Sequence, residues 1–179
     1  MAILGFTAHH VIASSAPEDW VRAELAEGDL SAPLKPRLVS RLAEKLGRHD
    51  DSLDILLAAE GLPGPVALRE TDVASHPRVL RALRHRVDVR AFTDALEQAV
   101  IVVGRGLALR HEVAVEVPES ARGRGLARDA LLGARRIVGP GGLLFAQAAP
   151  ANAASVRCLL AAGFRPIGAE ILFFAHAPL

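Results

Sequence analysis

Residues 115–128 combine glycines and arginines at a spacing that suits a phosphate-binding loop. The stretch reads VEVPESARGRGLAR. Gly123 and Gly125 lack side chains, so backbone N–H groups can approach a ligand closely. These groups lie where a helix is expected to begin, and partial positive charge collects at a helix N-terminus. Three arginines add full charges: Arg122, Arg124 and Arg128. The combination favours a phosphate or pyrophosphate as the ligand.

Two other glycine motifs and a plain turn are alternative interpretations of this loop. A dinucleotide-binding fingerprint would need a third glycine where Arg128 stands, and no clear acidic strand end follows about 20 residues later. A P-loop would need Gly-Lys-Ser/Thr, which the stretch lacks. A loop that merely turns the chain also stays open, because short glycine motifs arise by chance.

The loop joins a predicted strand to a predicted helix. Residues 111–117 alternate polar and apolar side chains until Pro118 ends the strand. Residues 126–138 place apolar side chains on one side of a helical wheel and charged ones on the other, with Leu132 as the exception. Gly139 and the proline after it end this helix.

A second motif follows at residues 152–164, which read NAASVRCLLAAGF. The earlier strand at residues 111–117, with the Arg-x-x-Gly-x-Ala motif of residues 122–127 after it, is similar to the acetyl-CoA loop of the GNAT family (Gcn5-related N-acetyltransferases). The downstream motif resembles that family's Asn-x-x-Ala/Ser…Gly-Phe helix. The resemblance covers roughly residues 66–179. Residues 1–62 carry no hallmark of the family.

The resemblance implies that acetyl-CoA, the co-substrate, binds at the strand end, the loop and the second helix. The expected cofactor-binding residues are Val115, Glu116, Val117, Arg122, Gly123, Arg124, Gly125, Leu126, Ala127, Arg128, Asn152 and Ser155. By resemblance, Asn152 bonds the pantetheine or pyrophosphate region of acetyl-CoA. Asn152 also suits the N-cap of its helix, and the two roles are compatible. No metal ligand is predicted.

The chemistry that this resemblance implies is acetyl transfer to an amine. Backbone N–H groups at Val115, Glu116 and Val117 of a splayed strand can stabilise the developing oxyanion. A general base must take the ammonium proton, and Glu116, Glu112 and His111 lie on or beside the strand. The predicted catalytic residues are Glu116, which is nearest the loop, and His111, whose offset resembles the acidic residue of histone-type members. Each could equally be a plain exposed strand residue.

The family pattern is incomplete at one position. Many members place a tyrosine where this chain has Leu159, as the acid that protonates the leaving thiolate, and this sequence contains no tyrosine. Cys158 points away from that stripe on the helix and is interpreted as a core thiol. Proximity alone can still drive aminolysis. The alternatives to an N-acetyltransferase are a non-catalytic acyl-CoA-binding sensor or interaction module, and a different nucleotide-binding enzyme.

Composition limits the compartment and the partners. The 179 residues are 51% hydrophobic with a net charge of +1, which predicts a folded core without a general attraction to nucleic acid or membranes. The basic segment 76–86 has no interleaved aromatics, so it is either a solvated helix face or a site that attracts an acidic acceptor or a phosphate. One cysteine, no membrane-length apolar run and no basic signal region predict a cytoplasmic protein.

The predicted fold class is α/β of the α+β type, with a mixed, mostly antiparallel sheet flanked by helices. Residues 1–62 form an N-terminal extension of two helices and a strand, and residues 66–179 form the GNAT-like core after a glycine–proline linker. Other strands are predicted at 9–13, 53–59, 66–70, 87–93, 98–107, 143–148 and 164–175, and other helices near 17–28, 33–46 and 74–86. The acceptor is expected to be a small-molecule or peptide amine. The extension either packs on the core or builds a homodimer.

Overall fold

The computed structural model describes residues 1–25, 27–51, 53–72 and 74–175, and the chain forms two compact units. Unit 1 contains Met1–Leu56, Ala148–Ala151 and the chain from Ile167 onward, whereas unit 2 contains Leu57–Gln147 and Asn152–Pro166. The units therefore interleave in sequence, which differs from a single boundary between residues 62 and 66. The reason is that the C-terminal strand pairs with the first strand of the chain.

The predicted fold class is confirmed. Antiparallel pairs dominate the sheet structure, one described pair is parallel, and five α-helices flank the strands within the described residues. Across these same residues, no helix combines the length and the apolar character needed to cross a membrane.

Unit 1 is built on strands in the order β3-β10-β1-β2. Its elements are β1 (Ala2–Phe6), β2 (His9–Ala13), α1 (Glu18–Glu24), α2 (Pro36–Leu46), β3 (Arg48–Asp50) and β10 (Arg165–Ala175), which begins in unit 2. Leucines four residues apart give α2 an apolar face, which packs with Ile3 and Phe173. Gly47 ends α2 in the left-handed conformation, with φ of 59°. β1 and β3 were not expected from the sequence.

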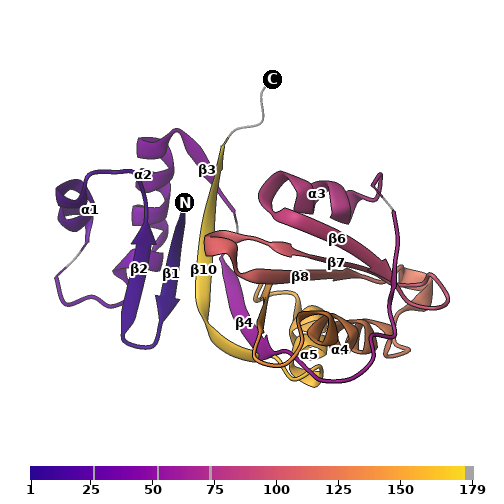
Figure 1. Ribbon diagram of the computed structural model, residues 1–179. Coiled ribbons are helices and arrows are strands. Elements are labelled where there is room, and N and C mark those ends of the chain that lie inside the picture. The colour runs from indigo at the N-terminus through magenta and orange to yellow at the C-terminus, as the bar shows by residue number, and fades with distance from the viewer. Residues whose placement is uncertain (26, 52, 73, 176–179) are drawn as a thin grey trace. The chain divides into compact units, whose positions relative to one another are not determined.

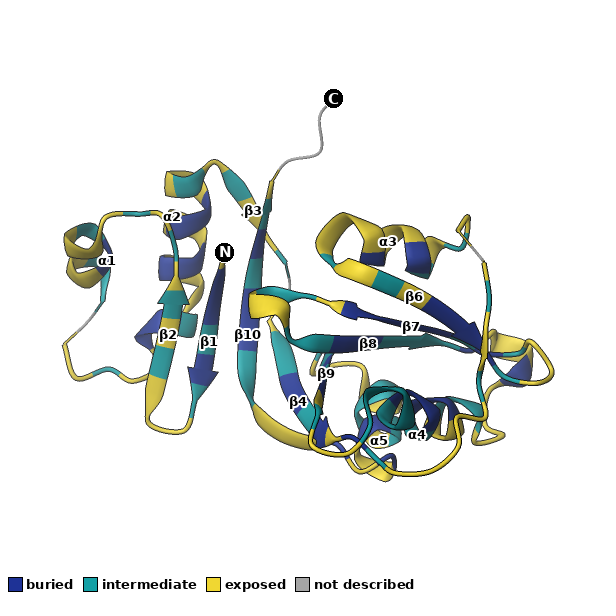
Figure 2. Cartoon of the chain, viewed as in Figure 1, coloured by how far each residue is buried: buried dark blue, intermediate teal, exposed yellow. Residues whose placement is uncertain are grey.

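Unit 2 holds strands in the order β4-β9-β8-β7-β6-β5. Its elements are β4 (Asp54–Glu60), which begins in unit 1, β5 (Arg69–Glu70), α3 (Pro77–His85), β6 (Val87–Thr93), β7 (Val100–Arg105), β8 (His111–Glu116), α4 (Leu126–Val138), β9 (Leu143–Ala148) and α5 (Ala153–Ala161). Within this unit, α3 lies on one side of β6, β7 and β8, and α4 and α5 lie on the other (Figure 1). β7 is buried over most of its length (Figure 2).

Residues 61–70, predicted as a linker followed by a strand, instead form a strap over α4. Only Arg69 and Glu70 form a strand there. The backbone N–H of Leu62 donates to the carbonyl of Arg135 at 3.0 Å. Leu68 lies so close to Gly133 that a Cβ there would meet its side chain at 2.7 Å, which explains a glycine in the middle of α4.

Candidate functional site

The glycine–arginine loop connects the end of β8 to the start of α4. Gly123 and Gly125 have φ of 76° and 81°, a left-handed conformation that glycine adopts without Cβ strain. Nothing lies within 4 Å of the position that a Cβ on Gly123 would occupy. Gly125 is the N-cap of α4, and no side chain caps this helix end. The first N–H groups of α4 are therefore available to an anionic ligand, and such a ligand can approach the backbone of the loop closely.

The three arginines of the loop tie it to its surroundings. Arg122 Nε donates to the carbonyl oxygen of Val117 at 3.2 Å, so that side chain folds back on the end of β8. Arg128 Nε donates to the carbonyl oxygen of Ala161 in α5 at 3.2 Å. Arg124 Nη1 donates to Gln98 Oε1 at 3.2 Å. These contacts hold the positive charges around the loop.

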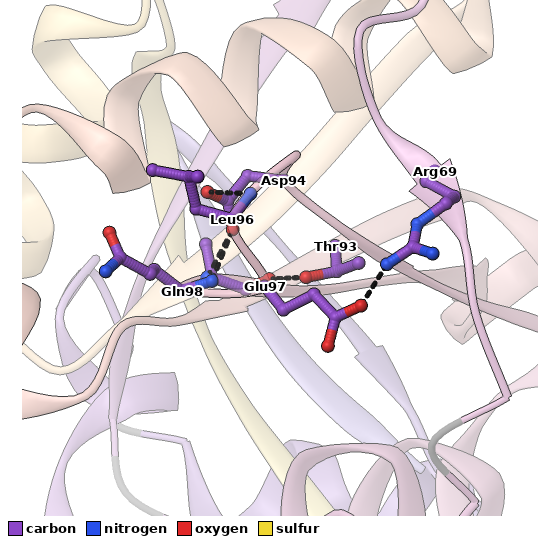
Figure 3. Close-up of polar contacts among 7 residues, drawn as sticks. Arg69, Thr93, Asp94, Leu96, Glu97 and Gln98 are labelled. Atoms are coloured by element: carbon purple, nitrogen blue, oxygen red, sulfur yellow. Dashed lines mark hydrogen bonds and ion pairs between the residues drawn. The ribbon is translucent and has the colours of Figure 1, made fainter.

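Gln98 belongs to a turn between β6 and β7 that is ordered by one carboxylate. Asp94 accepts hydrogen bonds from the backbone N–H groups of Leu96 and Gln98 and from that of Ala99, at 2.7–3.3 Å (Figure 3). Glu97 of the same turn forms an ion pair with Arg69 of the strap (Figure 3). The predicted turn near Asp94 is thus present, and it supports the loop through Gln98.

β8 has one fully paired edge and one edge that opens. Its antiparallel ladder with β7 runs from His111, opposite Arg105, to Glu116, opposite Val100. The parallel ladder with β9 covers only His111 with Leu144 and Glu112 with Phe145. From Val113 onward, every second N–H of β8 points away from β7 and meets no described ladder partner in β9. This open stretch ends at the glycine loop.

The two predicted catalytic residues lie on opposite faces of the sheet. Glu116 faces α3, where its Oε2 accepts from Arg78 Nε at 3.1 Å. His111 lines a cleft with Ile137 and Val138 of α4 on the other face. They are also separated along the strand by roughly 16 Å, at 3.3 Å per residue. Both stay predictions, but they cannot act together on one amine.

Glu112, which the sequence offered as a further base, is buried in an ion cluster. Its carboxylate is bound by Arg86 Nε at 2.9 Å and by Arg110 Nε at 2.7 Å. Its side chain is only 5% exposed. Burial lowers the pKa of Arg86 from its ordinary value, and the charge of Glu112 opposes that shift. Gly106 of the β7–β8 hairpin packs directly on the carboxylate. This enclosure does not suit a base that must reach a substrate.

Asn152 is the N-cap of α5. Its Oδ1 accepts from the backbone N–H of Ser155 at 3.1 Å. Further along α5, Leu159, where the sequence resemblance led us to expect a tyrosine, is buried. Burial raises the pKa of the Cys158 thiol, and the charge of Arg128 opposes this only in part. The thiol is therefore a weak nucleophile near neutral pH.

Substitution of Asn152 separates its capping role from a cofactor role. We expect Asn152→Ala to lower the free energy of unfolding by about 1 kcal/mol, because the cap is lost. Asn152→Ser keeps a capping oxygen and removes the amide, so stability should stay near that of the wild type. Urea unfolding and CoA calorimetry on both variants provide the check. Weaker CoA binding by the serine variant supports a cofactor contact, and unchanged binding limits Asn152 to capping.

Comparison with known proteins finds solved structures of low sequence identity to this chain. No protein-family model matches the sequence, and no match was found among curated proteins. A Novosphingobium aromaticivorans DSM 12444 protein, assigned as an acetyltransferase from the GNAT family, is 16% identical, with a TM-score of 0.47 over 74% of this chain and 69% of its own. A GCN5-related N-acetyltransferase from Kribbella flavida is 18% identical, with a TM-score of 0.45 over 78% of this chain and 64% of its own.

A third solved structure is a tandem GNAT protein from the clavulanic acid biosynthesis pathway. It is 15% identical, with a TM-score of 0.42 over 93% of this chain and 64% of its own. The chain therefore spans less than two thirds of the length of the Kribbella and clavulanic acid pathway proteins. These three solved structures are GNAT-family proteins, to which this chain is similar.

Proposed function

We propose that the chain is an N-acetyltransferase that moves an acetyl group from acetyl-CoA to a primary amine. The observation that carries this proposal is the junction of an uncapped helix start at Gly125 with the open edge of β8. The first feature suits the diphosphate of CoA, and the second offers N–H groups to an acyl oxygen. The open space around Gly123 fits the cofactor as well, because a ligand can reach the backbone there.

Acetyl-CoA supplies an activated acetyl group, and the residues of the chain position and deprotonate the amine. The loop and the start of α4 hold the diphosphate, and Arg122, Arg124 and Arg128 surround it with positive charge. Backbone N–H groups between Val115 and Val117 stabilise charge on the acyl oxygen. Glu116 takes the proton from the ammonium group of the acceptor. Asn152 and Ser155 complete the proposed cofactor contacts from α5.

A non-catalytic acyl-CoA-binding sensor or interaction module is the second candidate. Leu159 provides no acid for the leaving thiolate, and Arg78 occupies the carboxylate of Glu116. As an enzyme, the chain would need solvent or the acceptor to supply that proton. A cytoplasmic location and a homodimer stay predictions from the sequence.

The decisive experiment pairs CoA binding with thiol release. Calorimetry with CoA and acetyl-CoA tests the binding site, and release of free CoA over a panel of primary amines tests turnover. Binding with release supports the enzyme, whereas binding without release supports the sensor. Displacement of CoA by ATP or NAD would indicate a different nucleotide-binding enzyme, and absence of CoA binding would overturn the proposal.

Glu116→Gln tests the general base within the same assay. We expect thiol release to fall about a hundredfold, because glutamine cannot accept the ammonium proton. CoA affinity should be unchanged. Glu119→Gln is the control, because Glu119 is an exposed carboxylate that also precedes the glycines of the loop. This variant should keep the turnover of the wild type. Equal turnover in both variants would remove Glu116 from the mechanism.

A further inference from the structure

Two ion pairs of unequal exposure join α3 to β8. Glu112 and Glu116 point to the same face of β8, because side chains repeat every second residue along a strand. The Arg86–Glu112 pair is buried, with side chains 12% and 5% exposed. The Arg78–Glu116 pair is open, with side chains 39% and 42% exposed. The buried pair fixes α3 on the sheet, and the open pair is accessible to a small molecule.

The helix α3 brings positive charge to this face and no carboxylate of its own. α3 contains arginines and a histidine but no acidic residue. The carboxylate of Glu112 already forms ion pairs with both Arg86 and Arg110. Arg86 Nη1 is buried without a hydrogen-bond partner among the described residues, and Arg81 lies near enough for its charge to help lower the pKa of Arg86. The positive charge of α3 favours an anionic group on a ligand that binds between α3 and the end of β8.

Arg78 has unused donors at the open end of this face. Its Nε donates to Glu116 Oε2 at 3.1 Å, and its two Nη groups form no hydrogen bond or ion pair found among the described residues. A guanidinium group binds a carboxylate best through two parallel N–H groups. Arg78 can therefore receive a second carboxylate beside Glu116.

We propose that Arg78 selects acceptor amines that carry a carboxylate. This inference rests on the proposed function, since it names the acceptor class of the same site. A carboxylate held by the Nη groups of Arg78 places the attached amine next to Glu116. An amine without a carboxylate lacks this anchor and is not held beside Glu116.

Matched acids and amides provide the test. The probes are glycine with glycinamide, β-alanine with β-alaninamide, and 4-aminobutanoate with its amide, so that the spacing of amine and carboxylate varies. Thiol release from acetyl-CoA gives kcat/KM for each probe. We expect the wild type to prefer at least one acid over its amide by tenfold or more, and Arg78→Gln to lose that preference. Arg84→Gln, on the exposed side of the same helix, should retain it.

A binding measurement separates this inference from the proposed function. Calorimetry of each acid with the protein–CoA complex requires no turnover. If an acid binds the wild type and Arg84→Gln but not Arg78→Gln, the carboxylate site is supported even when no thiol is released. In that case only the enzymatic proposal fails. Equal turnover of acids and amides overturns the inference while the enzyme stands. An absence of acid binding and of any acid preference also overturns it.

Discussion

Gly125→Val is expected to weaken CoA binding on the order of a thousandfold in a protein that stays folded. The φ of Gly125 is 81°, and a valine side chain there would project where the ligand must approach the start of α4. Loss of two charge-assisted hydrogen bonds, each worth about 1.5–3 kcal/mol, accounts for an effect of this size. The nearest atom to a Cβ at Gly125 is Asp129 Oδ2 at 4.0 Å, so no clash inside the protein prevents folding.

Gly47→Val is the matched control for that experiment. Gly47 also adopts the left-handed conformation, with φ of 59° and ψ of 41°, and nothing lies within 4 Å of its Cβ position. Both variants pay a similar conformational strain of about 1–2 kcal/mol, which thermal unfolding would register. Calorimetry should then find CoA binding lost in the first variant and kept in the second. Equal CoA affinity in the two would contradict the assignment of the loop.

Local periodicity predicted the elements around the site well. The helix at 126–138 and the strands at 87–93 and 143–148 have the predicted bounds. Each contains its own signal: an apolar stripe in the helix, and β-branched or apolar runs bounded by turn residues in the strands. The glycines of the loop were also informative, since both adopt the positive φ that only glycine reaches easily.

The pairing of strands that are far apart in the sequence leaves no local pattern of this kind. β1 pairs with β10 from the opposite end of the chain, and β3 has only three residues. The buried partner Arg86 lies at the end of α3, and nothing in the spacing predicts that it meets Glu112. Arg110 is two residues before Glu112 and shares its face of the extended chain, so that contact was predictable. The placement of His111 and Glu116 on opposite faces of the strand could likewise be predicted from the sequence. Their numbers differ by five, and an odd difference places two strand residues on opposite faces.

The two ion pairs of β8 lead to the largest stability prediction. Glu112→Ala is expected to lower the free energy of unfolding by about 3–5 kcal/mol, because it leaves the charges of Arg86 and Arg110 buried without their shared carboxylate. Glu116→Ala removes a carboxylate from the same face of the same strand, where water reaches both partners. Its expected loss is about 0–1 kcal/mol.

Urea unfolding of the two variants measures this difference directly. Similar losses would mean that the enclosure of Glu112 does not decide its contribution. A third variant distinguishes a missing charge from a missing contact. Glu112→Gln keeps the size of the side chain and one accepting oxygen but removes the charge, so a loss as large as that of Glu112→Ala would assign the effect to the missing charge. A much smaller loss would assign it to the missing contact. The buried pair of Arg86 with Glu112 would thus hold α3 in register above β8, with Arg78 beside Glu116.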